Sequence, residues 1–213
     1  MELQVWLAYF LASWAIALSP GSGAVLSMTH GLAYGVRKTG ATIAGLQLGL
    51  AVILLVAGVG VGALLVASAA AFTVVKFAGA AYLIWLGFKQ WRAHVPVHAT
   101  TPDAQPLSAA VPDARERFLT GFFTNVTNPK GIVFMVAVLP QFIDPSRPLW
   151  LQLLVLLVTT IGVDLLVMHG YAYLASRAQR WLATARARRT QNRVFGGVLM
   201  GMGVSLLLVK RGA

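Results

Sequence analysis

Apolar residues fill most of the chain in six runs, separated by basic residues, prolines and short polar stretches. Crossing the hydrocarbon core of a bilayer takes roughly 20 apolar residues. The runs cover residues 5–34, 41–67, 72–88, 118–142, 149–174 and 194–209. This pattern predicts an all-α integral membrane protein with about six transmembrane helices.

Two of these runs, the first and the fourth, are interrupted in the middle. Residues 19–23 (SPGSG) separate 5–18 from 24–34, and residues 128–131 (NPKG) divide the fourth run. Proline lacks an amide hydrogen and glycine loosens a helix. We therefore expect two half-helices that meet inside the membrane at each interruption.

The chain divides into a first repeat, 1–91, a linker, 92–117, and a second repeat, 118–213, which together form one transmembrane domain. The linker is expected to be solvated because it is rich in proline, histidine and charged residues. Each repeat contains three apolar runs and begins with a broken one. Since three is an odd number, the second repeat is expected to be inverted relative to the first.

Composition supports a lipid environment. Hydrophobic residues make up 58% of the chain and charged residues 11%, against roughly 45–50% and about 25% in soluble domains. The net charge of +11 does not indicate nucleic-acid binding, because the basic residues lie between the apolar runs. Residues 1–4 contain no Lys or Arg, so we expect the first run to be retained rather than cleaved as a signal.

Basic residues indicate the orientation, because cytoplasmic loops are enriched in them. Lys130 is set apart because it lies in a broken run. Four bases fall on one side of the predicted membrane: Lys76, Arg147, Lys210 and Arg211. Twelve fall on the other: Arg37, Lys38, Lys89, Arg92, Arg115, Arg117, Arg177, Arg180, Arg186, Arg188, Arg189 and Arg193. This predicts a cytoplasmic linker and both termini in the periplasm of a bacterial inner membrane.

The interruptions are the predicted binding site. Half-helix N-termini offer amides and a positive dipole end to an anion, and unwound carbonyls can hold a cation. A zwitterion such as an amino acid suits both. Most candidate substrate-binding residues lie in the two breaks: Pro20, Gly21, Ser22, Gly23, Asn128, Pro129 and Lys130. Two more, Gln47 and Asn125, are polar residues within apolar runs.

Asp164 is the candidate for proton coupling, because it lies about midway along the fifth run and a charge there is costly. It could bind an ammonium group or cycle a proton. The structural alternatives are an ion pair with Lys130 or hydrogen bonds to Thr159 and Thr160. His30 and His169 are expected to be packed or interfacial rather than proton carriers.

Four stretches resemble the LysE/RhtB family of amino-acid exporters: residues 19–21 with 31–40, 76–92, 121–144 and 164–211. Members of that family transport homoserine, threonine, lysine, leucine and related solutes. The resemblance implies an inverted-repeat helical fold and efflux coupled to the proton motive force. The family's first motif commonly reads Pro-Gly-Pro-Asn, whereas this chain has PGSG at positions 20–23.

These observations predict a proton-coupled exporter of amino acids or their derivatives, with a small zwitterion, protons and the lipid bilayer as partners. No cofactor, metal or enzymatic activity is expected, since the sequence has neither a phosphate-binding loop nor a zinc motif. The alternatives are a membrane-embedded enzyme and a non-transporting scaffold. The pattern fits a monomer or a homodimer.

Overall fold

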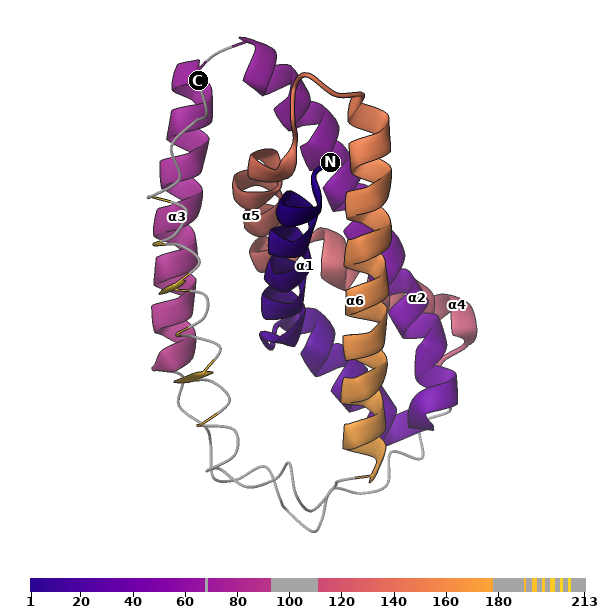
Figure 1. The fold of residues 1–213 in the computed structure, drawn as a ribbon. Helices are drawn as coiled ribbons and strands as arrows, with labels where there is room; N and C mark the ends of the chain where they lie inside the picture. Colours follow the sequence, from indigo (N-terminus) through magenta and orange to yellow (C-terminus); the bar gives the residue numbers. More distant parts are fainter. Residues whose placement is uncertain are drawn as a thin grey trace.

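A computed structural model describes residues 1–67, 69–92 and 111–177, and the single positions 190, 193, 194, 197, 200, 201, 204 and 207. The chain forms the helices α1 (Leu3–Leu18), α2 (Ser22–Ala67), α3 (Ala69–Trp91), α4 (Ala114–Val126), α5 (Pro129–Val138), η1 (Leu139–Phe142, a 3-10 helix) and α6 (Leu149–Arg177) (Figure 1). Most of the predicted linker and most of the predicted sixth span lie outside the described residues.

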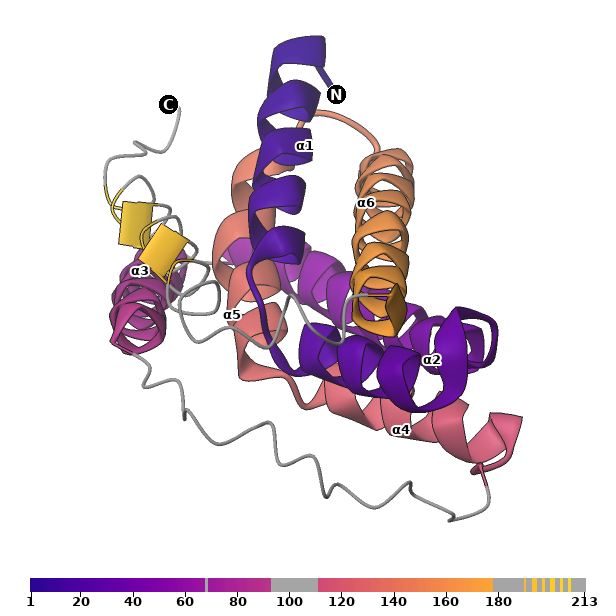
Figure 2. The same cartoon turned by 90° about the horizontal axis from the view of Figure 1, so that it is seen from below.

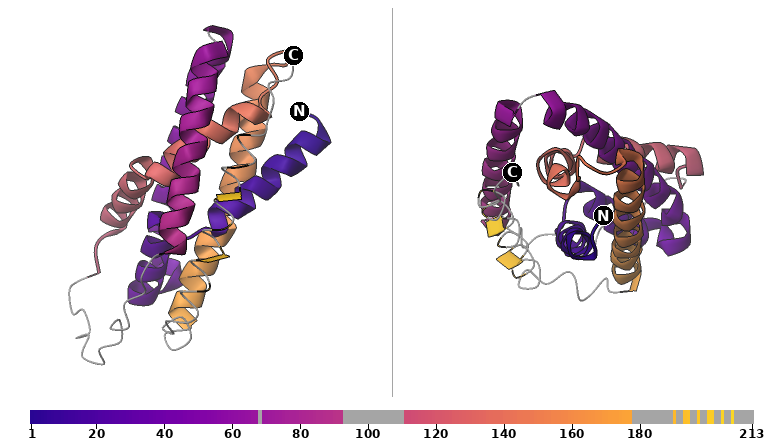
Figure 3. Two further views of the ribbon diagram at one scale, coloured as in Figure 1. Left: turned by 90° about the vertical axis from the view of Figure 1, so that its left-hand side faces the viewer. Right: turned by 45° about the horizontal axis from the view of Figure 1, so that its top comes forward.

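The short helices α1 and α5 lie inside a frame made by α2, α3 and α6, as the right-hand view of Figure 3 shows. Helix α4 runs along α2 on the outer side, and α3 stands at the edge against α5 (Figure 2). Many large apolar side chains are exposed, among them Leu11 (67%), Val56 (68%) and Leu166 (65%). An outer surface of this kind suits lipid rather than water.

Two described helices are long and apolar enough to cross a membrane: α2, within Ser22–Gly60, and α6. The pair Ala114–Val126 and Pro129–Phe142, bent by 50°, could make a third span, and α1 is a shorter apolar helix. The prediction of an all-helical membrane protein is therefore confirmed. The arrangement of six helices as two inverted repeats stays a prediction.

Both predicted helix interruptions are present, and both are shorter than the sequence indicates. Helix α1 ends at Leu18 and α2 already begins at Ser22; α4 ends at Val126 and α5 begins at Pro129. The second break is short because proline fits the first position of a helix, where its missing amide hydrogen would have no intrahelical partner. Residues 129–131 thus form the first turn of α5 instead of a loop.

Gly35 reverses the chain inside α2. Its backbone has φ 75° and ψ 163°, outside the helical region. The two arms on either side run back along each other: His30 Nδ1 lies 2.7 Å from Thr42 Oγ1, and Gly23 packs against Leu46. The first run therefore turns into the second through one glycine.

Replacing Gly35 by alanine is expected to destabilise the protein by about 1–3 kcal/mol, because this backbone conformation is essentially restricted to glycine. Nothing lies within 4 Å of the position a Cβ would take, so the cost comes from the backbone alone. Gly40→Ala is the matched control, since Gly40 also has open space but no positive φ. Thermal unfolding in detergent should show a lower Tm for Gly35→Ala only; equal midpoints would contradict the reversal.

The interior consists of two apolar clusters. One is built around Tyr9, Leu54 and Phe134, where α1, α2, α5 and α6 meet. The other is built around Ile43 and Val163, where both arms of α2 pack with α1 and α6. Between the two clusters lies a cavity, which residues of both clusters line together with polar side chains.

Candidate functional site

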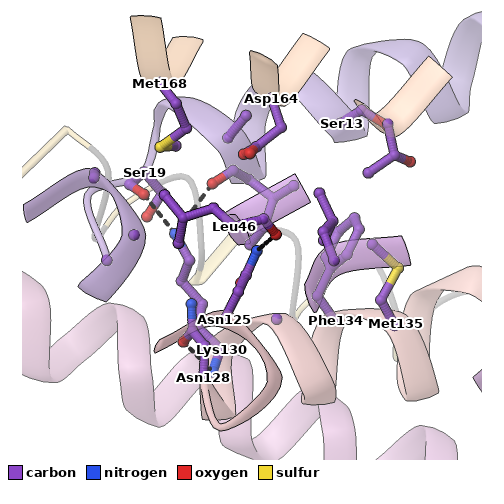
Figure 4. A pocket seen from close by; sticks show the side chains of 18 residues that line it. Ser13, Ser19, Leu46, Asn125, Asn128, Lys130, Phe134, Met135, Asp164 and Met168 are labelled. Carbon is purple, nitrogen blue, oxygen red and sulfur yellow. Dashed lines mark hydrogen bonds between the residues drawn. The ribbon is translucent and has the colours of Figure 1, made fainter. Parts of the chain in front are cut away.

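The cavity has a volume of about 60 Å³ and lies where the two helix breaks face each other. Ser19 and Gly21 line it from the first break, and Asn128 and Lys130 line it from the second. Asp164 of α6 closes another side. Figure 4 shows these polar side chains converging from separate helices on one small space.

Lys130 is the cation of the cavity. Its ammonium Nζ donates hydrogen bonds to the backbone carbonyls of Ile16, at 3.1 Å, and Ser19. Both carbonyls belong to the C-terminal end of α1, where the helix dipole is negative and favours a cation. The aliphatic stem of Lys130 passes so close to Gly21 that a Cβ there would lie 3.2 Å from Cε. Because Gly21 has no side chain, the side chain of Lys130 can pass it and reach the end of α1.

Asn128 and Asn125 hold the second break in shape. Asn128 is the N-cap of α5, and its Oδ1 accepts a hydrogen bond from the backbone amide of Lys130 at 3.1 Å. Asn125 is buried, and its Nδ2 donates to the carbonyl of Leu46 at 2.6 Å. These two hydrogen bonds position the backbone of Lys130 relative to α2.

Asp164 is the anion of the cavity, and its partner is an amide. Gln47 Nε2 donates to Asp164 Oδ2 at 2.7 Å, across a sequence separation of 117 residues. Among the described residues the ion pairs are those of Arg147 with Glu2 and with Asp144. Lys130 and Asp164 therefore line the same cavity with opposite charges and without direct contact.

The structure shows neither of the structural alternatives for Asp164, which were an ion pair with Lys130 and hydrogen bonds to Thr159 and Thr160. Asp164 makes no ion pair with Lys130. Trp6 Nε1 donates to Thr159 Oγ1 at 3.0 Å, and the Tyr9 hydroxyl bonds to Thr160. Both threonines thus bind α1 and not the carboxylate.

Of the predicted site residues, the structure brings six together around the cavity: Gly21, Gly23, Asn125, Asn128, Lys130 and Asp164. The other four lie outside its lining: Pro20, Ser22, Gln47 and Pro129. Pro129 is the first residue of α5, Pro20 lies between α1 and α2, and Gln47 reaches the site through Asp164. The binding roles themselves remain predictions.

Part of the cavity lining was not predicted from the sequence. Ser13 and Thr160 face the cavity, as do the apolar side chains of Phe134, Met135 and Met168. A serine or threonine inside an apolar run is a weak signal, because such hydroxyls often bond to their own helix.

Neither histidine belongs to the site. Nδ1 of His30 lies at hydrogen-bonding distance from Thr42, and that of His169 lies 2.9 Å from the carbonyl oxygen of Leu165 on its own helix. Among the described residues, no group of His, Cys, Asp and Glu could hold a metal ion.

Ionisable residues inside a membrane protein mark substrate or ion pathways, and Lys130 and Asp164 line one cavity behind an apolar exterior. The chain matches the family model described as LysE type translocator over residues 14–210, and it belongs to that family.

Relatives with similar lengths share much of the sequence. The chain is 45% identical over 206 residues to the homoserine/homoserine lactone efflux protein of Salmonella typhi, covering 97% of each. It is also 45% identical over 210 residues to an uncharacterized membrane protein of Vibrio cholerae, covering 99% of this chain and 100% of that protein. A leucine efflux protein of Klebsiella pneumoniae is 36% identical over 141 residues, 65% of this chain and 63% of that one. No solved structure matches the chain.

Proposed function

We propose that this protein is a secondary transporter that exports amino acids or their derivatives across a bacterial inner membrane in exchange for protons. The observation that carries the proposal is the pair of opposite charges, Lys130 and Asp164, on one cavity without contact between them. A charge inside a membrane costs about 2.5–3.5 kcal/mol on insertion scales. Two such charges kept apart suit a ligand that carries both opposite charges itself.

The solute lies between the two charged groups. Its carboxylate faces Lys130 and the backbone of residues 21–23, and Asp164 either holds its ammonium or exchanges it for a proton. Moving one proton across 100 mV is worth about 2.3 kcal/mol. At 1.4 kcal/mol per factor of ten, this drives an about fortyfold solute gradient.

The names of the relatives support the substrate class. Homoserine and leucine share an α-ammonium and an α-carboxylate but differ in side chain. The lining of this cavity is also mixed, with Ser13 and Thr160 beside Phe134, Met135 and Met168. We therefore assign recognition to the amino-acid backbone and leave the identity of the solute to experiment.

The topology belongs to the same proposal: six crossings in two inverted repeats, with a cytoplasmic linker and both termini in the periplasm. Its support is that both helix breaks line one cavity. The chain contains no cysteine, so Glu2→Cys and Ala213→Cys each introduce a single thiol. A membrane-impermeant maleimide should label both variants in intact spheroplasts, and protection of either would contradict this orientation.

Transport is tested with purified protein in proteoliposomes loaded with a mixed pool of amino acids. An imposed proton gradient should drive specific amino acids across the membrane, whereas liposomes without protein should retain them. Depletion of one or a few solutes identifies the cargo. Absence of flux from every amino acid and its lactone or amide derivative would favour the scaffold alternative.

A further inference from the structure

The C-terminal end of α1 has the features of a binding site for an ammonium group. In a helix, the carbonyl of residue i accepts from the amide of residue i+4. The partner expected for Ile16 is residue 20, which is a proline and has no amide hydrogen. The carbonyl of Ile16 therefore lacks its usual helical donor, and Lys130 Nζ donates to it instead.

Three carbonyls at this helix end accept hydrogen bonds from two side chains, Tyr171 and Lys130. The Tyr171 hydroxyl donates to the carbonyl of Leu18 at 2.7 Å. The carbonyls of Ile16 and Ser19 accept from Nζ of Lys130, and both residues line the cavity. Two carbonyl oxygens at the negative end of a helix dipole therefore hold one primary ammonium next to the proposed solute site.

We infer that the carbonyls of Ile16 and Ser19 form a binding site for the ammonium group of the solute, which the side chain of Lys130 fills in this structure. The inference rests on the proposed function. During transport, the ammonium of the solute takes the place of Nζ on the two carbonyls, and Lys130 turns to the carboxylate of the solute. The carbonyls then hold the ammonium of the solute, and of its two proposed roles Asp164 keeps that of exchanging a proton.

This exchange keeps every buried charge compensated. A buried ammonium without a partner is costly, so Lys130 can leave the carbonyls only when an anion receives it. Asp164 lines the same cavity, but a zwitterion supplies both an anion for Lys130 and a replacement cation for the carbonyls. Lysine suits the movement because its ammonium is a compact charge on a flexible four-carbon stem. The carbonyls need N–H donors, so primary ammonium groups fit and quaternary ones do not.

The test removes the ammonium group of Lys130 by mutation and adds methylammonium as a soluble replacement. Lys130→Met keeps a flexible stem of similar length and removes the ammonium that donates to both carbonyls. Methylammonium chloride at four to five times its Kd should then raise the Tm of the variant by about 2–4 °C. Tetramethylammonium chloride and sodium chloride at the same ionic strength should have no such effect. The wild-type Tm should not respond to methylammonium, because Lys130 holds the carbonyls.

A double variant separates the carbonyls from Asp164 as the source of binding. In Lys130→Met with Asp164→Asn, the methylammonium shift should persist if the carbonyls bind the ammonium. Loss of the shift in the double variant would overturn the inference and assign the ammonium to Asp164. An equal shift in wild-type protein, or no shift specific to methylammonium in Lys130→Met, would overturn it as well.

The measurement needs no transport, so it fails independently of the proposed function. A methylammonium-specific shift together with absent amino-acid flux would support the site and contradict the exporter. If Lys130→Met is too unstable to purify in plain buffer, the yield of monodisperse protein replaces the Tm. That yield should be higher when purification is carried out in methylammonium than in tetramethylammonium, and equal yields would overturn the inference.

Discussion

Proton-driven transport should be lost in Asp164→Asn, with a decrease of at least about 100-fold in the flux driven by a pH gradient. Asparagine cannot ionise, but its side-chain oxygen can still accept the hydrogen bond that Gln47 Nε2 donates to Asp164 at 2.7 Å. The fold around the site should therefore be kept while the proton carrier is removed. The measurement is solute flux into proteoliposomes with and without a proton gradient.

Asp144→Asn provides the matched control. Asp144 lies in the loop between η1 and α6, outside the cavity, and pairs with Arg147. Hydrogen bonds from the Ser146 side chain and backbone lower the pKa of Asp144 below its usual value, so it stays ionised at neutral pH and carries no proton in a transport cycle. Asp144→Asn should transport like the wild type. If Asp164→Asn keeps its proton-driven flux, Asp164 has no part in proton coupling.

Solute exchange without a proton gradient separates binding from coupling. If Asp164 serves only the proton, Asp164→Asn should still exchange labelled for unlabelled solute across the membrane. If Asp164 also holds the ammonium, exchange should fall together with proton-driven flux. The two proposed roles of this carboxylate thus predict different results in one preparation.

Sequence reasoning found the two charges of the cavity because charged residues inside apolar runs are rare and costly. Lys130 and Asp164 could be singled out on that basis alone. Their relation could not be predicted, because Gln47 is 117 residues from Asp164 in the sequence. Only the packing of α2 against α6 shows that an amide, and not the lysine, is the partner of the carboxylate.

The backbone part of the site was harder to foresee. Every residue has a carbonyl, so a carbonyl acceptor has no signature in composition or hydropathy. Pro20 is the one local signal, because it removes the amide that would bond to Ile16. The runs 5–34 and 41–67 predicted a connection between them, but not that a single glycine makes it. The glycine makes this turn alone through its positive φ.

Glycines allow α2 and α4 to pack closely against each other. Gly45 and Gly121 bring the two backbones together from opposite sides. A Cβ at Gly45 would lie 1.9 Å from the carbonyl oxygen of Phe118, and one at Gly121 would lie 2.1 Å from the carbonyl oxygen of Thr42. Small residues permit such close crossings in membrane helices.

Gly45→Ala and Gly121→Ala should each destabilise the protein by several kcal/mol, because backbone atoms cannot turn aside as a side chain can. Since total stability is about 5–15 kcal/mol, we expect a large loss of folded protein. The controls are Gly162→Ala and Gly170→Ala on α6, where nothing lies within 4 Å of the added Cβ. Size-exclusion profiles and Tm values of the four variants in detergent give the comparison.

The geometry of the cavity should depend on the contact between α2 and α4. Asn125 of α4 lines the cavity and donates a hydrogen bond to the carbonyl of Leu46 on α2. A Cβ at Gly49, one turn from Gly45, would lie 2.8 Å from the carbonyl oxygen of Phe122 and 3.0 Å from Cβ of Asn125, a milder clash than at Gly121. Gly49→Ala should therefore disturb transport at a smaller cost in Tm than Gly121→Ala. Midpoints within about 2 °C of the α6 controls for Gly45→Ala and Gly121→Ala would show that α2 and α4 do not cross at backbone contact.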